Sequence, residues 1–334
     1  MAAFEDVGPS TPITIPTRVD KVNPRVRLAG QLRATVIVAL AVFLLIPVLV
    51  MVVTAFKTRT DILASPPLIA FRPTLQGFVN LFTDRAIVAP GRMDEFKQRA
   101  QTGELGVWDQ IAFEMGQEIT GASDYVGRLQ NSLIIAGLST VLSVVLGLFA
   151  AYAFSRFQVP GKDDLLFFIL STRMLPAVVV VIPIFLLYRQ VGLTDSHLGM
   201  ILLYTAFNLS FSVWLLKGFI DEIPKEYEEA ALVDGYTRWQ AFFKIVLPQA
   251  VTGIAATTVF CLIFAWNEYA FALMLTSDRA RTAPPSIATM LGSGGMEWSG
   301  IAAGSLGFLI PVVIVTFALR KYLLRGITFG AIRQ

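Results

Sequence analysis

The chain has 334 residues, of which 55% are hydrophobic and 15% are charged, and its formal net charge at pH 7 is +3. Soluble domains carry about 25% charged residues, so this composition indicates a protein that lies largely in lipid. The basic residues lie beside apolar runs and form no single polar cluster, which argues against nucleic-acid binding. With one histidine and one cysteine, the sequence excludes an intrachain disulfide and a histidine-rich metal site.

Six apolar runs are long enough to cross a hydrocarbon core of about 30 Å, which takes about 20 helical residues. The first run is too long for the apolar part of a signal peptide, so we expect it to remain as a span. Pro176 and Pro183 interrupt the third run and should bend it. We therefore predict an all-α integral membrane protein with six transmembrane helices, at 34–56, 129–155, 165–188, 198–216, 251–277 and about 299–319.

Lysine and arginine residues concentrate on the N-terminal side of the predicted membrane, whereas the short loops on the other side hold only Arg189, Arg279 and Arg281. Because basic residues are retained in the cytoplasm, we expect both termini to be cytoplasmic. The predicted organisation is a cytoplasmic tail 1–33, a first span 34–56, a long external segment 57–128, a transmembrane core 129–320 with a cytoplasmic loop 217–250, and a cytoplasmic tail 321–334.

The long external segment contains a stretch, 93–119, that mixes helix formers with scattered apolar residues. This pattern predicts one or two short amphipathic helices. Such helices could rest on the membrane surface or on a partner subunit, or they could dock an external protein. Apolar residues on a helix face do not say which surface they meet, so both interpretations stay open.

The cytoplasmic loop 217–250 shows the signals of two short helices. Asp221 is a plausible cap and Pro224 suits a first turn, which predicts a helix from about 223 to 234. Gly235 can adopt the positive φ that ends a helix, and Thr237 can start the next one. Pro248 marks the turn back into the membrane.

The same loop carries a spaced motif: Glu229-Ala230-Ala231, three residues, Gly235, nine residues, and then Ile245-x-Leu247-Pro248. This motif resembles the EAA signature of bacterial ABC importer permeases, at the expected place between the fourth and fifth spans. The stretches "NSLIIAGLSTVLSVVLGLFAAYAFSRF" and "AWNEYAFALML" are similar to the carbohydrate-importer, maltose-type (MalG-like) branch. The resemblance covers about 125–334 closely and 30–75 loosely, whereas the region around 82–124 is longer than the family leads us to expect.

The resemblance implies a MetI/MalG-like permease fold in the bacterial inner membrane, with an extended first periplasmic loop. It implies that the EAA loop forms a coupling helix, with Glu229, Ala230, Ala231, Asp234, Gly235, Ile245, Leu247 and Pro248 as the residues that meet an ATPase. The implied partners are a second, MalF-like permease, a dimer of cytoplasmic ABC ATPases, a periplasmic or lipid-anchored solute-binding protein and membrane lipid. The implied function is ATP-driven import of a carbohydrate or polyol by alternating access.

The chain itself lacks a G-x-x-x-x-G-K-[ST] phosphate loop, so we expect no bound cofactor and no catalysis here, with ATP and Mg²⁺ on the partner ATPases. An ion-coupled secondary transporter is the alternative, and it should show inverted repeats and carboxylates near mid-membrane. Only Glu268 meets the second criterion, and no repeat is visible. A membrane-embedded enzyme would need a catalytic constellation at span depth, and none is apparent.

Two charged residues, Arg173 and Glu268, lie inside apolar runs, where an ionised group is costly unless it is paired or wet. Their depths along the predicted helices argue against a direct ion pair. Arg173 can serve the structure or the substrate. Trp266, Asn267 and Glu268 offer an aromatic face, an amide and a carboxylate, a set that can bind sugars, although Trp266 could equally be an interface anchor.

Overall fold

The computed structural model describes residues 24–68, 70–292 and 295–329, so most of the predicted N-terminal tail and the last five residues lie outside the described part. The chain divides into two compact units, 1–50 and 51–334. Four of the described helices are long and apolar enough to cross a membrane, and two bent helix pairs raise the number of possible spans to six. The four are α1 (Pro24–Ala55), α6 (Tyr125–Arg156), α9 (His197–Asp221) and α16 (Trp298–Phe329).

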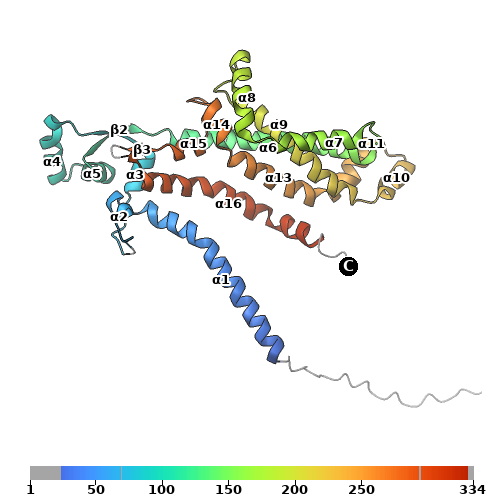
Figure 1. The fold of residues 1–334 in the computed structure, drawn as a ribbon, viewed down its shortest axis with the longest axis horizontal. Coiled ribbons are helices and arrows are strands. Elements are labelled where there is room, and N and C mark those ends of the chain that lie inside the picture. The colour runs from blue at the N-terminus through green and yellow to red at the C-terminus, as the bar shows by residue number, and fades with distance from the viewer. Residues whose placement is uncertain (1–23, 69, 293–294, 330–334) are drawn as a thin grey trace, which may run out of the picture. The chain divides into compact units, whose positions relative to one another are not determined.

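The third predicted span is broken instead of gently bent. It consists of α7 (Lys162–Ser171), a 3-10 turn (Thr172–Met174) and α8 (Ala177–Val191), and the two parts meet at 94°. Pro183 lies inside α8 and does not end it. The break falls at Leu175 and Pro176, which are extended, because a proline disfavours helical backbone in the residue before it. Figure 1 shows α8 standing across the direction of α7.

The fifth predicted span, 251–277, is shorter than expected. Helix α13 (Val251–Trp266) ends before Glu268, which lies in a turn ahead of α14 (Ala270–Leu275). The Glu268 carboxylate accepts hydrogen bonds from the backbone N–H groups of Phe271 at 2.9 Å and Ala272 at 3.1 Å. A side chain that satisfies backbone donors in this way competes with continued helix, which explains the break. A short helix, α15 (Ala283–Ala288), follows.

The core of the second unit is the bundle of α6, α9 and α13, which pack against one another. Helices α6 and α9 approach closely at Gly147, where an added Cβ would lie 2.3 Å from the hydroxyl oxygen of Ser212. One buried cluster lies between these helices at the end that contains Tyr152, Leu216 and Phe242. A second, around Tyr204 and Trp266, also includes α8 and α14.

The long segment between α1 and α6 forms a small folded layer. The predicted helices in 93–119 are confirmed as α4 (Met93–Gln101) and α5 (Val107–Glu114), preceded by a 3-10 turn (Pro90–Arg92). Strands β1 (Thr83–Ile87) and β2 (Gln117–Ala122), which the sequence patterns did not reveal, pair antiparallel with Thr83 opposite Ala122. The segment also contains two further helices, α2 (Arg59–Leu63) and α3 (Gln76–Phe82).

A second antiparallel pair lies near the other end of the chain and consists of β3 (Leu291–Gly292) and β4 (Gly295–Met296).

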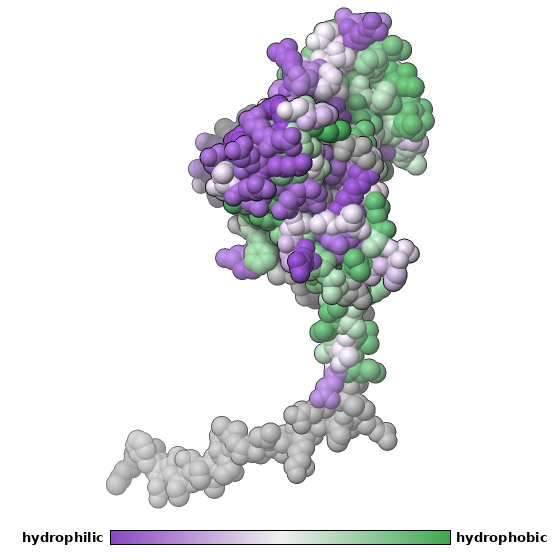
Figure 2. Space-filling model, turned by 90° about the vertical axis from the view of Figure 1, so that its left-hand side faces the viewer, coloured by the Kyte–Doolittle hydropathy of each residue, from purple (hydrophilic) through white to green (hydrophobic). Residues whose placement is uncertain are grey.

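A buried polar network joins this layer to the start of α16. The Asn80 amide donates to the Glu297 carboxylate at 2.7 Å, and the Arg85 guanidinium donates to the side chains of Asn80 and Gln117. Tyr125, at the start of α6, donates to the Gly304 carbonyl at 2.8 Å. Figure 2 looks onto the end of the molecule that carries α4 and α5 and shows hydrophilic residues gathered there.

Candidate functional site

The connector between α9 and α13, residues 222–250, lies at the opposite end of the second unit from α4 and α5 (Figure 1). It contains α10 (Lys225–Val233), α11 (Arg238–Ala241), a π-helical segment (Phe242–Val246) and α12 (Leu247–Gln249). Pro224 precedes α10 without a side-chain cap. The expectation that Asp221 caps this helix was wrong, because Asp221 ends α9 and its carboxylate accepts hydrogen bonds from Ser155 and Lys217.

Helix α10 is fastened to the end of α6 by a buried ion pair. The Arg156 guanidinium contacts the Glu228 carboxylate, and only 5% and 8% of the two side chains are exposed. The Tyr152 hydroxyl donates to the same carboxylate at 2.9 Å, and Arg156 also donates to the Ile223 carbonyl at 2.9 Å. Breaking a buried pair of this kind leaves an uncompensated charge, so the contact holds α10 in one position on α6.

The turn between α10 and α11 is specified by three residues. Gly235 has a φ of +88°, a conformation that glycine adopts without the steric cost of a Cβ. The Thr237 hydroxyl accepts from the Gln240 N–H at 3.3 Å, and the Gln240 side chain accepts from the Thr237 N–H at 2.8 Å. This reciprocal capping box starts α11.

The second half of the connector is anchored by apolar contacts. Phe242 and Val246 are fully buried, and the Phe242 ring lies 4.7 Å from the Tyr152 ring. Ile245 and Leu247 are half-buried, and Pro248 is exposed. A bend of 72° separates α11–α12 from α13. Tyr152 therefore contacts both halves of the connector, through its hydroxyl and through its ring.

The structure divides the motif residues of α10 between two faces. Ala231 is buried beside Glu228, whereas Glu229, Ala230, Asp234 and Gly235 are exposed. The alanine pair therefore does not form one surface. The exposed face also carries Tyr227 and Val233, with exposed fractions of 53% and 87%. Glu229 and Val233 are four residues apart and so are neighbours on this face.

Sequence reasoning missed the two residues that fix the connector, Glu228 and Arg156. Both were visible as charges: Glu228 precedes the motif, and Arg156 ends an apolar run. Their pairing joins positions 72 residues apart, however, and no local pattern reports such a contact. The exposed Trp239 and Phe243, whose rings stack 6.2 Å apart, were likewise not singled out as surface residues.

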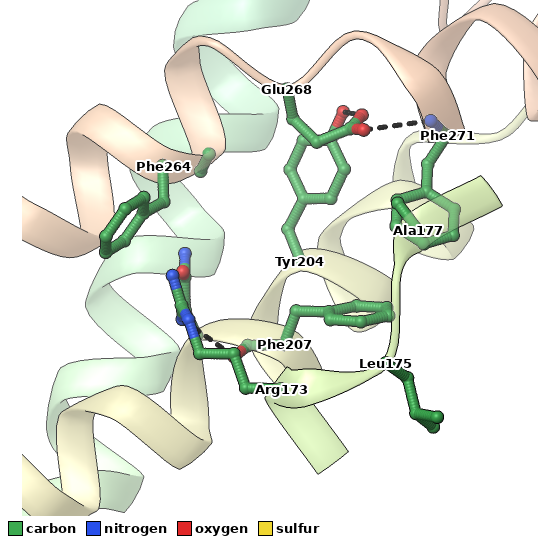
Figure 3. Close-up of a pocket in the computed structure, with 10 residues that line it drawn as sticks. Arg173, Leu175, Ala177, Tyr204, Phe207, Phe264, Glu268 and Phe271 are labelled. Carbon is green, nitrogen blue, oxygen red and sulfur yellow. Dashed lines mark hydrogen bonds between the residues drawn. The ribbon is translucent and has the colours of Figure 1, made fainter. Parts of the chain in front are cut away.

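A pocket of about 300 Å³ lies where the broken third span faces α9 and α13 (Figure 3). Arg173 and Glu268 both line it, although their predicted depths had separated them. Among the residues that the structure describes they form no ion pair with each other. The other principal lining residues are Tyr204, Phe207, Asn208 and Phe264.

The two charged residues are held in different ways. Arg173 donates to the Phe207 carbonyl at 3.2 Å, and its guanidinium lies 4.1 Å from the centre of the Phe264 ring. Glu268 accepts from the Tyr204 hydroxyl at 2.7 Å in addition to its two backbone donors. The pocket thus presents a cation on the side of the third span and a carboxylate on the side of the α13–α14 turn.

The other two residues expected near the solute lie outside the lining of this pocket. Trp266 is 2% exposed, stacks on Phe308 at 4.8 Å and donates to the Phe308 carbonyl at 3.2 Å. Asn267 is exposed and donates to the Ile263 carbonyl at 2.9 Å. The structure therefore brings together Arg173 and Glu268 but places Trp266 and Asn267 elsewhere.

A latch outside the spans ties α8 to α14. Asp195, in the turn after α8, accepts backbone hydrogen bonds at 3.1 to 3.3 Å from each residue of the turn after α14, Ser277, Asp278, Arg279 and Ala280. Burial alone would raise the pKa of Asp195, but these N–H donors together lower it to about 2. The carboxylate is therefore ionised at neutral pH and holds the two turns together.

Four membrane-length helices and two bent helix pairs, one of which contributes Arg173 to the pocket that Glu268 also lines, indicate the membrane-embedded subunit of a transporter. Residues 143–329, more than half of the chain, match the family described as "Binding-protein-dependent transport system inner membrane component". The chain belongs to this family, the inner-membrane permease subunits of ABC importers. Membership does not favour the alternative of an ion-coupled transporter.

Two relatives and one solved structure illustrate the similarity. The chain is 37% identical to the trehalose transport system permease protein SugB of Mycobacterium tuberculosis (strain CDC 1551 / Oshkosh) over 67% of this chain and 82% of the relative. It is 29% identical to the trehalose/maltose transport system permease protein MalG of Thermococcus litoralis over 89% and 94%. A bacterial importer of the polysaccharide alginate has a chain with the same fold, with a TM-score of 0.62 and 20% identity over 89% of this chain and 97% of that chain.

Proposed function

We propose that this permease imports a carbohydrate or polyol and that its connector, residues 222–250, receives the movement of partner ATPases. The observation that carries the proposal is the two-faced construction of α10. One face is fixed to α6 by the buried Arg156–Glu228 pair, while the other exposes Glu229 and Val233, which no element within the described part of the chain covers. A helix built in this way can pass a displacement from an external partner to the membrane bundle.

In the proposed cycle, closure of the ATPase pair displaces the exposed face of α10. Arg156 and Glu228 carry this displacement to α6, and Phe242 carries it to the same helix through Tyr152. Because α6 packs along α9 and α13, the bundle moves as a body and opens its cavity to the other side. Chemistry on ATP, with Mg²⁺, belongs to the partners, and this chain supplies only the mechanical connection.

The proposed orientation follows the distribution of basic residues. The connector has Arg156, Lys217, Lys225, Arg238 and Lys244 in it or near it, and this concentration of basic residues supports a cytoplasmic position for the connector and both termini. The layer formed by α2 to α5 with β1 and β2 then lies in the periplasm. The proposed partners are a second, MalF-like permease, two ABC ATPases and a periplasmic or lipid-anchored solute-binding protein.

The carbohydrate class is supported by the names of relatives, which include permeases for trehalose, for trehalose and maltose, and for diacetylchitobiose. Reconstitution of the whole transporter into liposomes tests it directly. Uptake of a labelled sugar should require ATP on the ATPase side and the solute-binding protein on the other. ATP-independent uptake driven by an ion gradient would contradict the proposal.

The connector is tested by Glu229→Lys and Gly235→Asp. Both residues are exposed, so both variants should insert in the membrane. We expect them to lose co-purification of the ATPases or to lose sugar uptake while ATP hydrolysis continues. A wild-type level of both co-purification and uptake in the two variants would refute the coupling role.

A further inference from the structure

Two helix breaks border the same pocket. The break of the third span contributes Arg173, Leu175 and Ala177 to its lining, and the end of α13 contributes Phe264 and Glu268. Figure 3 shows these side chains around the pocket, with Arg173 on one side and Glu268 and Tyr204 on the other. In membrane transporters, irregular backbone at membrane depth is tolerated where it lines a cavity, and discontinuous helices commonly form the solute site.

The side chains around the pocket provide donors and acceptors at opposite sides. The Arg173 guanidinium donates one hydrogen bond to the Phe207 carbonyl. Among the residues that the structure describes, no carboxylate forms an ion pair with it. An unpaired cation in a membrane span is costly unless water or a ligand solvates it. Across the pocket, the Glu268 carboxylate is fixed by three donors and cannot move toward Arg173 without losing them.

The lining residues indicate which class of ligand the pocket can bind. The guanidinium of Arg173 can only donate hydrogen bonds and the carboxylate of Glu268 can only accept them, so together they fit a neutral molecule whose groups both accept and donate. The rings of Phe207 and Phe271 supply apolar surfaces suited to the C–H faces of a sugar, while the Phe264 ring lies against the Arg173 guanidinium. The volume of about 300 Å³ is at the lower end for ligand pockets, about 300–1,000 Å³, which suits one or two sugar rings and not a long polymer.

We propose that this pocket is a solute subsite within the membrane, at which this subunit itself holds a neutral polyhydroxylated solute during transport. Arg173 donates to solute hydroxyl oxygens, the one lone pair that remains on the Glu268 carboxylate accepts from a solute hydroxyl, and the rings of Phe207 and Phe271 contact the ring faces. The inference rests on the proposed function and deepens it, because it assigns solute contact to this chain and not only to a sibling permease.

The test fills the pocket without removing any contact that builds it. Leu175 lines the pocket at its rim and is half-exposed (Figure 3), so Leu175→Trp adds bulk at the rim of that space. The matched control is Met174→Trp, one residue earlier, which is 76% exposed and does not line the pocket. Both variants are assembled with the complete transporter in liposomes, and uptake of labelled trehalose and maltose is measured per assembled complex.

We expect Leu175→Trp to lower uptake about tenfold or more, equivalent to about 1.4 kcal/mol or more of lost binding, with Met174→Trp near wild type. Equal uptake by Leu175→Trp and the wild type would overturn the subsite and leave the proposed function standing. Absence of ATP-dependent uptake by the wild type of trehalose, maltose and a panel of other labelled sugars and polyols would instead contradict the carbohydrate class. The two failures are therefore distinguishable.

A labelling experiment keeps the proposal falsifiable if Leu175→Trp fails to assemble. The sequence has a single cysteine, Cys261, so Cys261→Ala provides a cysteine-free background. In that background, Leu175→Cys and Met174→Cys are labelled with a small thiol reagent in the complete transporter during turnover. A transported sugar should slow labelling at position 175 and not at 174. Equal labelling with and without the sugar at position 175 would overturn the proposal.

Discussion

The guanidinium of Arg156 and the carboxylate of Glu228 form an ion pair that is almost wholly buried between α6 and α10. The pair has a third member in Tyr152, which donates to the same carboxylate. Because each charge depends on the other for its solvation, the three residues act as one unit, and the first prediction concerns this unit.

Replacing Glu228 by Gln should destabilise the protein strongly. The substitution leaves the buried Arg156 charge without its partner, which costs about 3 to 5 kcal/mol in comparable cases. The neighbouring Glu229→Gln is the matched control, since Glu229 is exposed and surface substitutions change stability by about 0.5 kcal/mol or less. Thermal unfolding of both variants in the same detergent measures the difference. Equal midpoints would show that the pair contributes nothing to stability.

Replacing Val233 by Ser should weaken ATPase association without loss of stability. Val233 is 87% exposed on α10, so removing its methyl groups disturbs no contact within the chain. If an ATPase covers this face, we expect a loss of about 1 to 2 kcal/mol, or roughly five- to thirtyfold in Kd. Val107→Ser, at the far end of the molecule, is the control, since Val107 is also exposed. The interpretation fails if both variants bind the ATPases equally well.

Replacing Gly235 by Ala isolates the cost of backbone strain. An added Cβ would meet no atom within 4 Å, so no steric overlap with neighbours contributes. The positive φ alone should cost about 1 to 2 kcal/mol. Gly127→Ala, in α6, also meets no atom within 4 Å and should be neutral or stabilising by up to about 1 kcal/mol. The comparison of unfolding midpoints would contradict this account if the two variants shifted in the same direction.

Replacing Asp195 by Asn should weaken the latch between the turns after α8 and α14 in a pH-dependent way. The folded pKa of Asp195, about 2, is below the unfolded value of about 3.9. The carboxylate therefore contributes stability that is fully present above the unfolded pKa and is lost as the pH falls through the folded pKa. The stability difference from the wild type should be constant from pH 5 to 8 and should shrink between about pH 4 and pH 2.

The neighbouring Asp278→Asn is the control for this measurement. Asp278 is exposed and takes part in the latch only through its backbone N–H, which the substitution leaves in place. A difference from the wild type that grows as the solution is acidified, or that matches that of Asp278→Asn at every pH, would contradict the assigned role of Asp195.

The positions of the unbroken spans could be predicted because charged residues flank uninterrupted apolar runs. The run 198–216 corresponds to α9, His197–Asp221, since Lys217 and Asp221 extend the helix beyond the apolar part. The breaks were harder to predict. Pro183 looked as disruptive as Pro176, yet the break falls at Pro176, whereas Pro183 lies inside α8.

The coupling residues could be proposed from the resemblance of the motif to the EAA signature, but their division between two faces could not. Ala230 and Ala231 are chemically identical in the sequence, and only the contact of α10 with α6 makes one buried and one exposed. In the same way, Glu268 looked like part of a span because its neighbours are apolar. The backbone donors that it satisfies belong to residues after it, and their arrangement follows from the fold.

Helix α6 runs without interruption for 32 residues, which at 1.5 Å per residue makes a rod of about 48 Å. At one end of the helix, Arg156 forms an ion pair with Glu228 of the connector. At the other end, Tyr125 donates a hydrogen bond to α16 beside the β1–β2 layer. A tilt of about 5° about one tip would move the other by about 4 Å. In the proposed cycle, a displacement at the connector would therefore reach the β1–β2 layer through one continuous helix.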